Sequence, residues 1–158
     1  MDPVERTRET VESQLSVLEE HYRTFPINQT TISVSRERYE REQERAQQEQ
    51  VWVYTRVHNE DDDVLHVADG DSFSLPSTTV ELSSLETTAR ELVEARTGIE
   101  CQLNGIEQAT ILGIQQAEAD DQDTIYRLAV VFDAAHESGT VQEEAVWRAE
   151  TDNLLTIA

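Results

Sequence analysis

The sequence predicts an α+β fold, in which a mixed β-sheet is covered by helices and a helical extension precedes it. Segments with strand character outnumber those with helix character and alternate with them along the chain, as expected for such a sheet. The length of 158 residues suits one domain with a sizeable core. We expect the helical extension over residues 1–50 and the main domain over residues 51–158.

The N-terminal extension is predicted to contain two helices. In the first, apolar residues recur at helical spacing from Pro3 to Arg23. Its apolar stripe either docks on the main domain, which we favour, or forms the seam of a homodimer. The second helix begins at Ser35, a good N-cap residue, and its many Glu and Arg residues predict a solvated surface. The stripe of the first helix comprises Val4, Val11, Leu15, Leu18 and Tyr22.

The main domain is predicted to begin with two strands. A short extended piece then ends at Pro76, and a helix with one apolar face follows and stops at Gly98. Two long strands, a last short strand and a short terminal helix complete the chain. In order, the strands are VWVYTRV, VLHVAD, CQLNGIEQATILGIQQ, TIYRLAVVFDA and EAVWRA, and the terminal helix is ETDNLLTI.

The charge balance is strongly acidic, with 33 acids against 12 basic residues, all of them Arg, for a net charge of −21. Such self-repulsion weakens a compact state at ordinary ionic strength. At about 1 M salt the Debye length falls to roughly 3 Å, and the repulsion largely vanishes. The composition resembles that of proteins from salt-accumulating halophilic archaea. It argues against nucleic-acid binding, which requires a basic surface.

The sequence also indicates a cytoplasmic protein without membrane contact. No apolar run approaches the roughly 20 residues that span a bilayer, and the N-terminus has no apolar signal region. The single cysteine, Cys101, excludes an intramolecular disulfide and fits a reducing compartment. We expect Cys101 to be a buried structural thiol, and His66, Trp52 and Trp147 to be packed in strands.

The stretch LPSTTVELSSLETTARELVEARTGIEC, residues 75–101, has the outline of a catalytic helix for phosphate chemistry. With the order of strands and the C-terminal EEAVWRAETDNLL, it resembles the Nudix hydrolase family over residues 51–155. The family signature is Gly, five residues, Glu, seven residues, then Arg-Glu-apolar-any-Glu-Glu-any-Gly-apolar. The resemblance implies a Nudix-like α/β/α sandwich that cleaves nucleoside diphosphates linked to another group. It also implies Mg²⁺ or Mn²⁺ held by glutamates of the signature, because these cations prefer oxygen ligands.

The signature fits this sequence in two registers, and the first is anchored at Gly98. Only Val93, Gly98 and Ile99 then match, and the paired acids fall on Ala95 and Arg96. Arg96 places a cation where a metal ligand belongs. We favour this register because it needs no insertion within the helix.

The second register is anchored at Arg90. Arg90, Glu91 and Glu94 then match, although one of the paired acids is missing. If the site is active, the resemblance implies that Arg90, Glu91 and Glu94 are its catalytic residues. Glu91 and Glu94 would be the metal ligands, with Glu81 or Glu86 as an outlying ligand.

Neither register contains the full set of acids, so the sequence predicts an eroded metal site. We expect a catalytically impaired domain that binds a nucleotide, a diphosphate small molecule or a partner. One alternative is an active diphosphatase that uses Mg²⁺ or Mn²⁺ and the non-standard acids Glu91 and Glu94. Another is an unrelated α+β module that dimerises through its N-terminal helix. The acidic loop at residues 118–123 would add a ligand only if it is more than a solvated turn.

Overall fold

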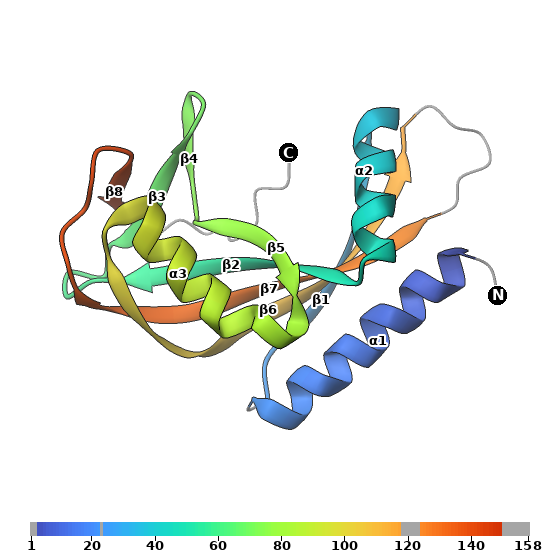
Figure 1. Ribbon diagram of the computed structural model, residues 1–158, viewed down its shortest axis with the longest axis horizontal. Helices are drawn as coiled ribbons and strands as arrows, with labels where there is room; N and C mark the ends of the chain where they lie inside the picture. The colour runs from blue at the N-terminus through green and yellow to red at the C-terminus, as the bar shows by residue number, and fades with distance from the viewer. Residues whose placement is uncertain (1–2, 23, 118–123, 150–158) are drawn as a thin grey trace.

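The computed structural model describes residues 3–22, 24–117 and 124–149, with side chains from Glu5 onward. It contains three α-helices and a sheet of eight strands (Figure 1). The predicted α+β class with a mixed sheet is therefore confirmed. The elements are α1 (Pro3–His21), β1 (Ile27–Val34), α2 (Arg36–Gln47), β2 (Gln50–His58), β3 (Val64–Asp69), β4 (Ser72–Ser74), β5 (Ser77–Glu81), a 3₁₀ turn (Leu82–Ser84), α3 (Leu85–Thr97), β6 (Glu100–Gln116), β7 (Ile125–Ser138) and β8 (Ala145–Arg148).

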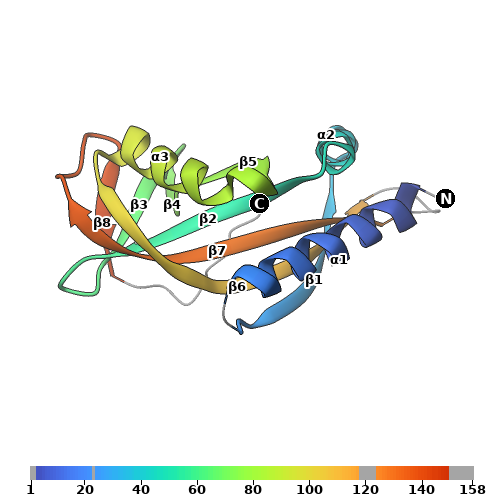
Figure 2. The ribbon, with the colours of Figure 1, turned by 60° about the horizontal axis from the view of Figure 1, so that its bottom comes forward.

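The sheet is built around the long antiparallel pair β6 and β7. Its strand order is β1-β6-β7-β2-β3-β4, while β5 pairs with β2 and β8 pairs with β3. The pairs β1–β6 and β2–β7 are parallel and the others are antiparallel. Figure 2 shows α2 over one end of the sheet, with β8 at the opposite end. The segments expected to be long strands thus form the centre of the molecule.

Helices cover both faces of the sheet because side chains along β7 alternate between them. Leu128, Val130 and Phe132 share a core cluster with residues of α1 and α3. Ile125 and Arg127 point to the other face, where they meet α2 through Tyr39 and Glu42, respectively. This arrangement gives the α/β/α layering that the sequence predicts.

The apolar stripe of α1 docks on this chain's own sheet. Val11, Leu15 and Leu18 are buried in the core cluster that also contains Phe132. The ring of Tyr22 meets Phe132 edge-on, with the ring centroids 6.0 Å apart. These side chains are therefore covered and are not left for a dimer seam; the side chain of Val4 lies outside the described residues.

Two strands were not expected from the sequence. The segment Ile27–Val34, expected as a connection, forms β1 and pairs with β6 from Ile27↔Ala109 to Val34↔Gln116. The segment Ser77–Glu81, expected as a turn, forms β5 and pairs with β2. In the structure, residues from both sides of Val51 share one sheet and one core. The division at Val51 therefore stays a prediction about which part of the chain resembles the Nudix family.

Two expected features lie outside the described residues: the acidic loop at residues 118–123 and the terminal helix expected over residues 150–157. In the described part of the chain, no helix combines the length and the apolar character needed to cross a membrane.

Candidate functional site

The helix α3 carries the residues that resemble the signature. Leu85, Ala89, Val93 and Thr97 recur every fourth residue and are all buried, which fixes the helix against the sheet. The helix ends at Gly98, whose φ of 80° lies in the left-handed region that glycine adopts at low cost. At this end the Gly98 N–H donates to the Glu94 carbonyl at 2.9 Å, and the Ile99 N–H donates to Oγ1 of Thr97 at 3.1 Å.

The burial pattern of α3 fits the register anchored at Gly98. The signature requires an apolar residue five positions before its glycine and another directly after it. In this register those residues are Val93 and Ile99, and both are fully buried. The other register places the first of them at Leu92, which is only half-buried. Packing therefore supports the register that assigns Arg96 to an acid position.

Arg96 lies on the flank of α3 that faces β3. Its guanidinium donates to the carbonyl of Ala68 at 3.4 Å. A fixed positive charge at this position repels a divalent cation. The neighbouring Ala95 offers no oxygen ligand, so this flank of α3 lacks the donors that Mg²⁺ or Mn²⁺ requires.

The other flank of α3 borders a groove of about 300 Å³, where the structure brings together Arg90, Glu91 and Glu94. Glu100 and Glu137 also line it, so that four carboxylates face one guanidinium. One of these carboxylates is already engaged, because Glu100 accepts a hydrogen bond from the Ser138 hydroxyl at 2.8 Å. The complete lining is Thr87, Arg90, Glu91, Glu94, Glu100, Cys101 and Glu137.

The two acids expected as outlying ligands lie elsewhere. Glu81 ends β5 and lines a different groove, between α1 and the 3₁₀ turn. Glu86 lies in the first turn of α3 beside Tyr22. Burial, assisted by Glu86, raises the pKa of Tyr22 to about 12. Neither acid lines the groove that contains Glu91 and Glu94.

The described residues do not form a site for a divalent metal. Across residues 5–22, 24–117 and 124–149, no three side chains of His, Cys, Asp or Glu converge closely enough to hold an ion. As the structure arranges them, the acids of the α3 groove thus do not converge on the Mg²⁺ or Mn²⁺ that the resemblance implies.

Cys101 and His66 have structural surroundings. Cys101 is buried, and burial raises the pKa of its thiol to about 11, so it is not a thiolate at neutral pH. His66 is buried in β3 with Nδ1 2.9 Å from the Val64 carbonyl oxygen. Both residues lie in strands, as the sequence predicts.

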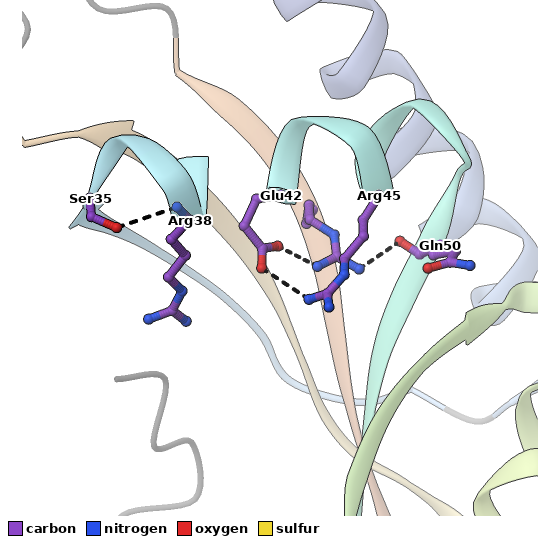
Figure 3. Close-up of polar contacts among 6 residues, drawn as sticks. Ser35, Arg38, Glu42, Arg45 and Gln50 are labelled. Atoms are coloured by element: carbon purple, nitrogen blue, oxygen red, sulfur yellow. Dashed lines mark hydrogen bonds and ion pairs between the residues drawn. The ribbon is translucent and has the colours of Figure 1, made fainter. Parts of the chain in front are cut away.

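A second polar cluster lies beneath α2, and sequence reasoning missed it. Glu42 of α2 is 2 % exposed and Arg127 of β7 is 1 % exposed, and the two form an ion pair (Figure 3). The second oxygen of Glu42 accepts from Arg45 at 3.4 Å, and Arg127 also donates to the Gln50 carbonyl at 3.3 Å. The interpretation of this helix as solvated is therefore wrong for the face that carries Glu42. The available signal was the arginine in the otherwise apolar stretch TIYRLAVVF.

Aromatic side chains of β2 complete this second cluster. The guanidinium carbon of Arg127 lies 5.3 Å from the centroid of the Trp52 ring. The rings of Trp52 and Tyr54 are stacked, with centroids 6.0 Å apart. Burial lowers the pKa of Arg127 to about 10 against the opposing effect of Glu42, so the guanidinium remains charged at neutral pH. We name Arg38, Glu42, Arg45, Trp52, Tyr54 and Arg127 the α2 cluster.

Comparisons with known proteins give structural likeness only. No family model and no curated protein matches this chain. A MutT protein from Methanosarcina mazei Go1 is similar with a TM-score of 0.45 and 21% identity, over 63% of this chain and 75% of that one. A Sinorhizobium meliloti 1021 protein classed by inference as an oxidoreductase is similar with a TM-score of 0.46 and 16% identity. That match covers 63% of this chain and 30% of the other, so the chain spans less than a third of its length.

Proposed function

We propose that this chain is a Nudix-type domain that binds a ligand without hydrolysing it. Support comes from the order of strands around α3 and from the burial of Val93 and Ile99 on either side of an Arg96 that replaces an acid. The observation that carries the proposal is the contact between Arg96 and the Ala68 carbonyl, which keeps a cation on the flank that needs carboxylates. Hydrolysis of a diphosphate requires divalent cations to neutralise the phosphate oxygens, and this flank does not attract them.

The proposed ligand is a nucleotide or another diphosphate small molecule, bound beside α3. Arg90 is the one cation among the residues that line the groove, and Thr87 adds a hydroxyl donor. The four carboxylates of the groove oppose a free polyphosphate, so we expect weak binding that tightens as salt screens their repulsion. The net charge of −21 leads us to propose a halophilic, cytoplasmic setting of archaeal type, where molar KCl provides that screening.

One observation favours an active diphosphatase as the second candidate. Glu91, Glu94, Glu100 and Glu137 all line one groove, and such acids attract divalent cations. In that case Glu100 and Glu137, not Glu81, would join the two acids expected from the sequence.

Calorimetry in molar KCl tests the choice between these functions. Mg²⁺ or Mn²⁺ is titrated into the protein, and a panel of nucleoside diphosphate derivatives is then assayed for turnover. We expect neither saturable metal binding nor turnover, and saturable binding of at least one nucleotide. Turnover that is lost in Glu91→Gln or Glu94→Gln but kept in Glu44→Gln, an exposed acid of α2, would establish the diphosphatase instead.

Restoring acids tests the register of the signature. The double variant Ala95→Glu/Arg96→Glu supplies the missing paired acids if Gly98 is the anchor. The single variant Ala95→Glu completes the set with Glu91 and Glu94 if Arg90 is the anchor. We expect a gain of Mn²⁺ binding in the double variant alone, whereas a gain in the single variant would reverse the assignment.

A further inference from the structure

We propose that the α2 cluster binds the oxyanion of a small molecule, a phosphate or carboxylate group, on the face of the sheet opposite to α3. The site is formed by α2, β2 and β7, and the anion contacts Arg38, Trp52, Tyr54 and Arg127. The proposal does not rest on the proposed function, because none of these residues belongs to the signature helix or lines the groove beside α3.

Three buried donors in the cluster have no acceptor. Nε1 of Trp52, the hydroxyl of Tyr54 and Nε of Arg127 are each buried and without a hydrogen-bond partner among the described residues. The side chains of Tyr54 and Arg127 are at most 4 % exposed. Buried polar groups in native proteins are nearly always hydrogen-bonded. Because all three groups are donors, the missing partner is an acceptor.

The acceptors already present in the cluster are engaged. Both oxygens of Glu42 bind terminal guanidinium nitrogens, one from Arg45 and the other from Arg127. The Gln50 carbonyl accepts from the remaining terminal nitrogen of Arg127. The stacked arrangement of Arg127, Trp52 and Tyr54 keeps the three free donors in one patch of the sheet.

The charge of the cluster favours an anion. The cluster contains three guanidinium groups, those of Arg38, Arg45 and Arg127, and one carboxylate, that of Glu42, which pairs with Arg45 and Arg127. This excess of cations occurs in a chain whose net charge is −21. Figure 3 shows Arg38, Glu42 and Arg45 pointing from the same side of α2. Burial raises the pKa of Tyr54, the charges of Arg38 and Arg127 oppose that rise, and the charge of Glu42 adds to it. Guanidinium groups bind phosphate and carboxylate oxygens through charge-assisted hydrogen bonds.

Arg38 connects the cluster with solvent. It is only half-buried, whereas Tyr54 and Arg127 are covered. An anion that enters beside Arg38 would exchange solvent for the donors of Tyr54, Trp52 and Arg127. A buried water molecule would satisfy the same donors without selecting for charge, so the distinguishing property of the proposed site is its dependence on an anion.

Thermal unfolding in potassium phosphate tests the proposal. Wild type, Tyr54→Phe, Arg38→Gln and Arg41→Gln are compared in phosphate and in KCl of equal ionic strength. Arg41 is an exposed residue of the same helix, so its variant is the matched control. Phosphate also stabilises proteins through exclusion from their surface, but that effect is common to all four proteins.

We expect a saturable rise of the melting temperature with phosphate in wild type and Arg41→Gln. In Tyr54→Phe and Arg38→Gln the phosphate concentration for half the rise should increase about tenfold or more, because each loses a charge-assisted bond or a donor. An acetate series at the same ionic strength distinguishes a carboxylate site from a phosphate site. In a Trp147→Phe background, phosphate should quench the fluorescence of Trp52 with the same half-maximal concentrations as those found from the melting temperature. Equal shifts in all four proteins, with no change in Trp52 emission, would overturn the proposal.

Discussion

The groove beside α3 and the cluster beneath α2 both contain Glu and Arg residues, but they hold them differently. Beside α3, Glu91 and Glu94 are exposed to solvent on the surface of an amphipathic helix. Beneath α2, Glu42 and Arg127 are withdrawn from solvent and paired. Glu91 and Glu94, which match the signature, are thus weakly constrained, whereas Glu42 in the charged helix α2 is tightly constrained.

This difference shows that a charge pattern in the sequence does not report how firmly its side chains are held. An exposed carboxylate is solvated and contributes little to stability. A buried ion pair is costly to break, because the remaining partner becomes an uncompensated charge in the interior. Replacement of Glu by Gln should therefore destabilise the protein beneath α2 and leave it unchanged or slightly more stable beside α3.

The largest expected effect is the removal of the buried carboxylate. Glu42→Gln leaves Arg127 buried beside a neutral partner, and we expect a loss of about 3–5 kcal/mol in the free energy of unfolding. Denaturant unfolding in molar KCl measures it. The matched variant Glu44→Gln, at an exposed position of the same helix, should change the free energy by less than about 0.5 kcal/mol. A similar small value for both variants would remove the contrast between the two regions.

The end of α3 should be sensitive to its glycine. In Gly98→Ala the new Cβ would lie 2.7 Å from the Thr140 carbonyl oxygen, at a φ of 80°. We expect a loss of about 1–3 kcal/mol in the free energy of unfolding. Gly70→Ala is the control, because Gly70 also has a positive φ but no atom within 4 Å of the new Cβ. If both variants lose the same amount, the contact with Thr140 does not fix the end of α3.

The thiol beside the α3 groove should make stability fall in alkaline solution. Burial raises the pKa of Cys101 to about 11 from 9.0. As the pH rises, the unfolded chain therefore loses this proton before the folded chain does. The contribution of the protonated thiol to the free energy of unfolding is complete below pH 9 and is lost as the pH rises through 11. We expect the difference in unfolding free energy between wild type and Cys101→Ala to shrink by up to about 2 kcal/mol from pH 8 to pH 11. A difference that stays constant over this range would show that the thiol titrates normally.

The smallest expected effect is at the acids of α3 themselves. Glu91→Gln and Glu94→Gln each remove one exposed carboxylate from a groove of four, so like-charge repulsion decreases. We expect a change within about 0.5 kcal/mol, towards greater stability at low salt, and no change at molar KCl. Thermal unfolding at a low and at a molar KCl concentration checks both expectations. A large loss in either variant would mean that the carboxylate has a specific partner.

Much of the fold could be predicted where the sequence is patterned. The stripe of α1, the strand β3 and the stop of α3 at Gly98 all appear in the structure where the sequence places them. β1 could not be predicted, because INQTTISV is a polar edge strand in which only Val34 is buried. β5 is short and mostly polar, so its Ser and Thr residues read as a turn.

The candidate site was predicted less completely than the fold. The sequence places Arg90, Glu91 and Glu94 on one helix, and the structure brings all three to one groove. Glu100 and Glu137 join them only because β6 and β7 return to this end of the sheet. The burial of Glu42 depends on an arginine 85 residues away, and no local pattern in the sequence reports such a pairing.

A crystal of the protein soaked in manganese chloride tests most directly whether α3 holds a divalent metal. The account predicts no ion bound by three or more protein oxygens anywhere along Arg90–Arg96. An ion held there by three such oxygens, from Glu91, Glu94 and a neighbour in the groove, would contradict it.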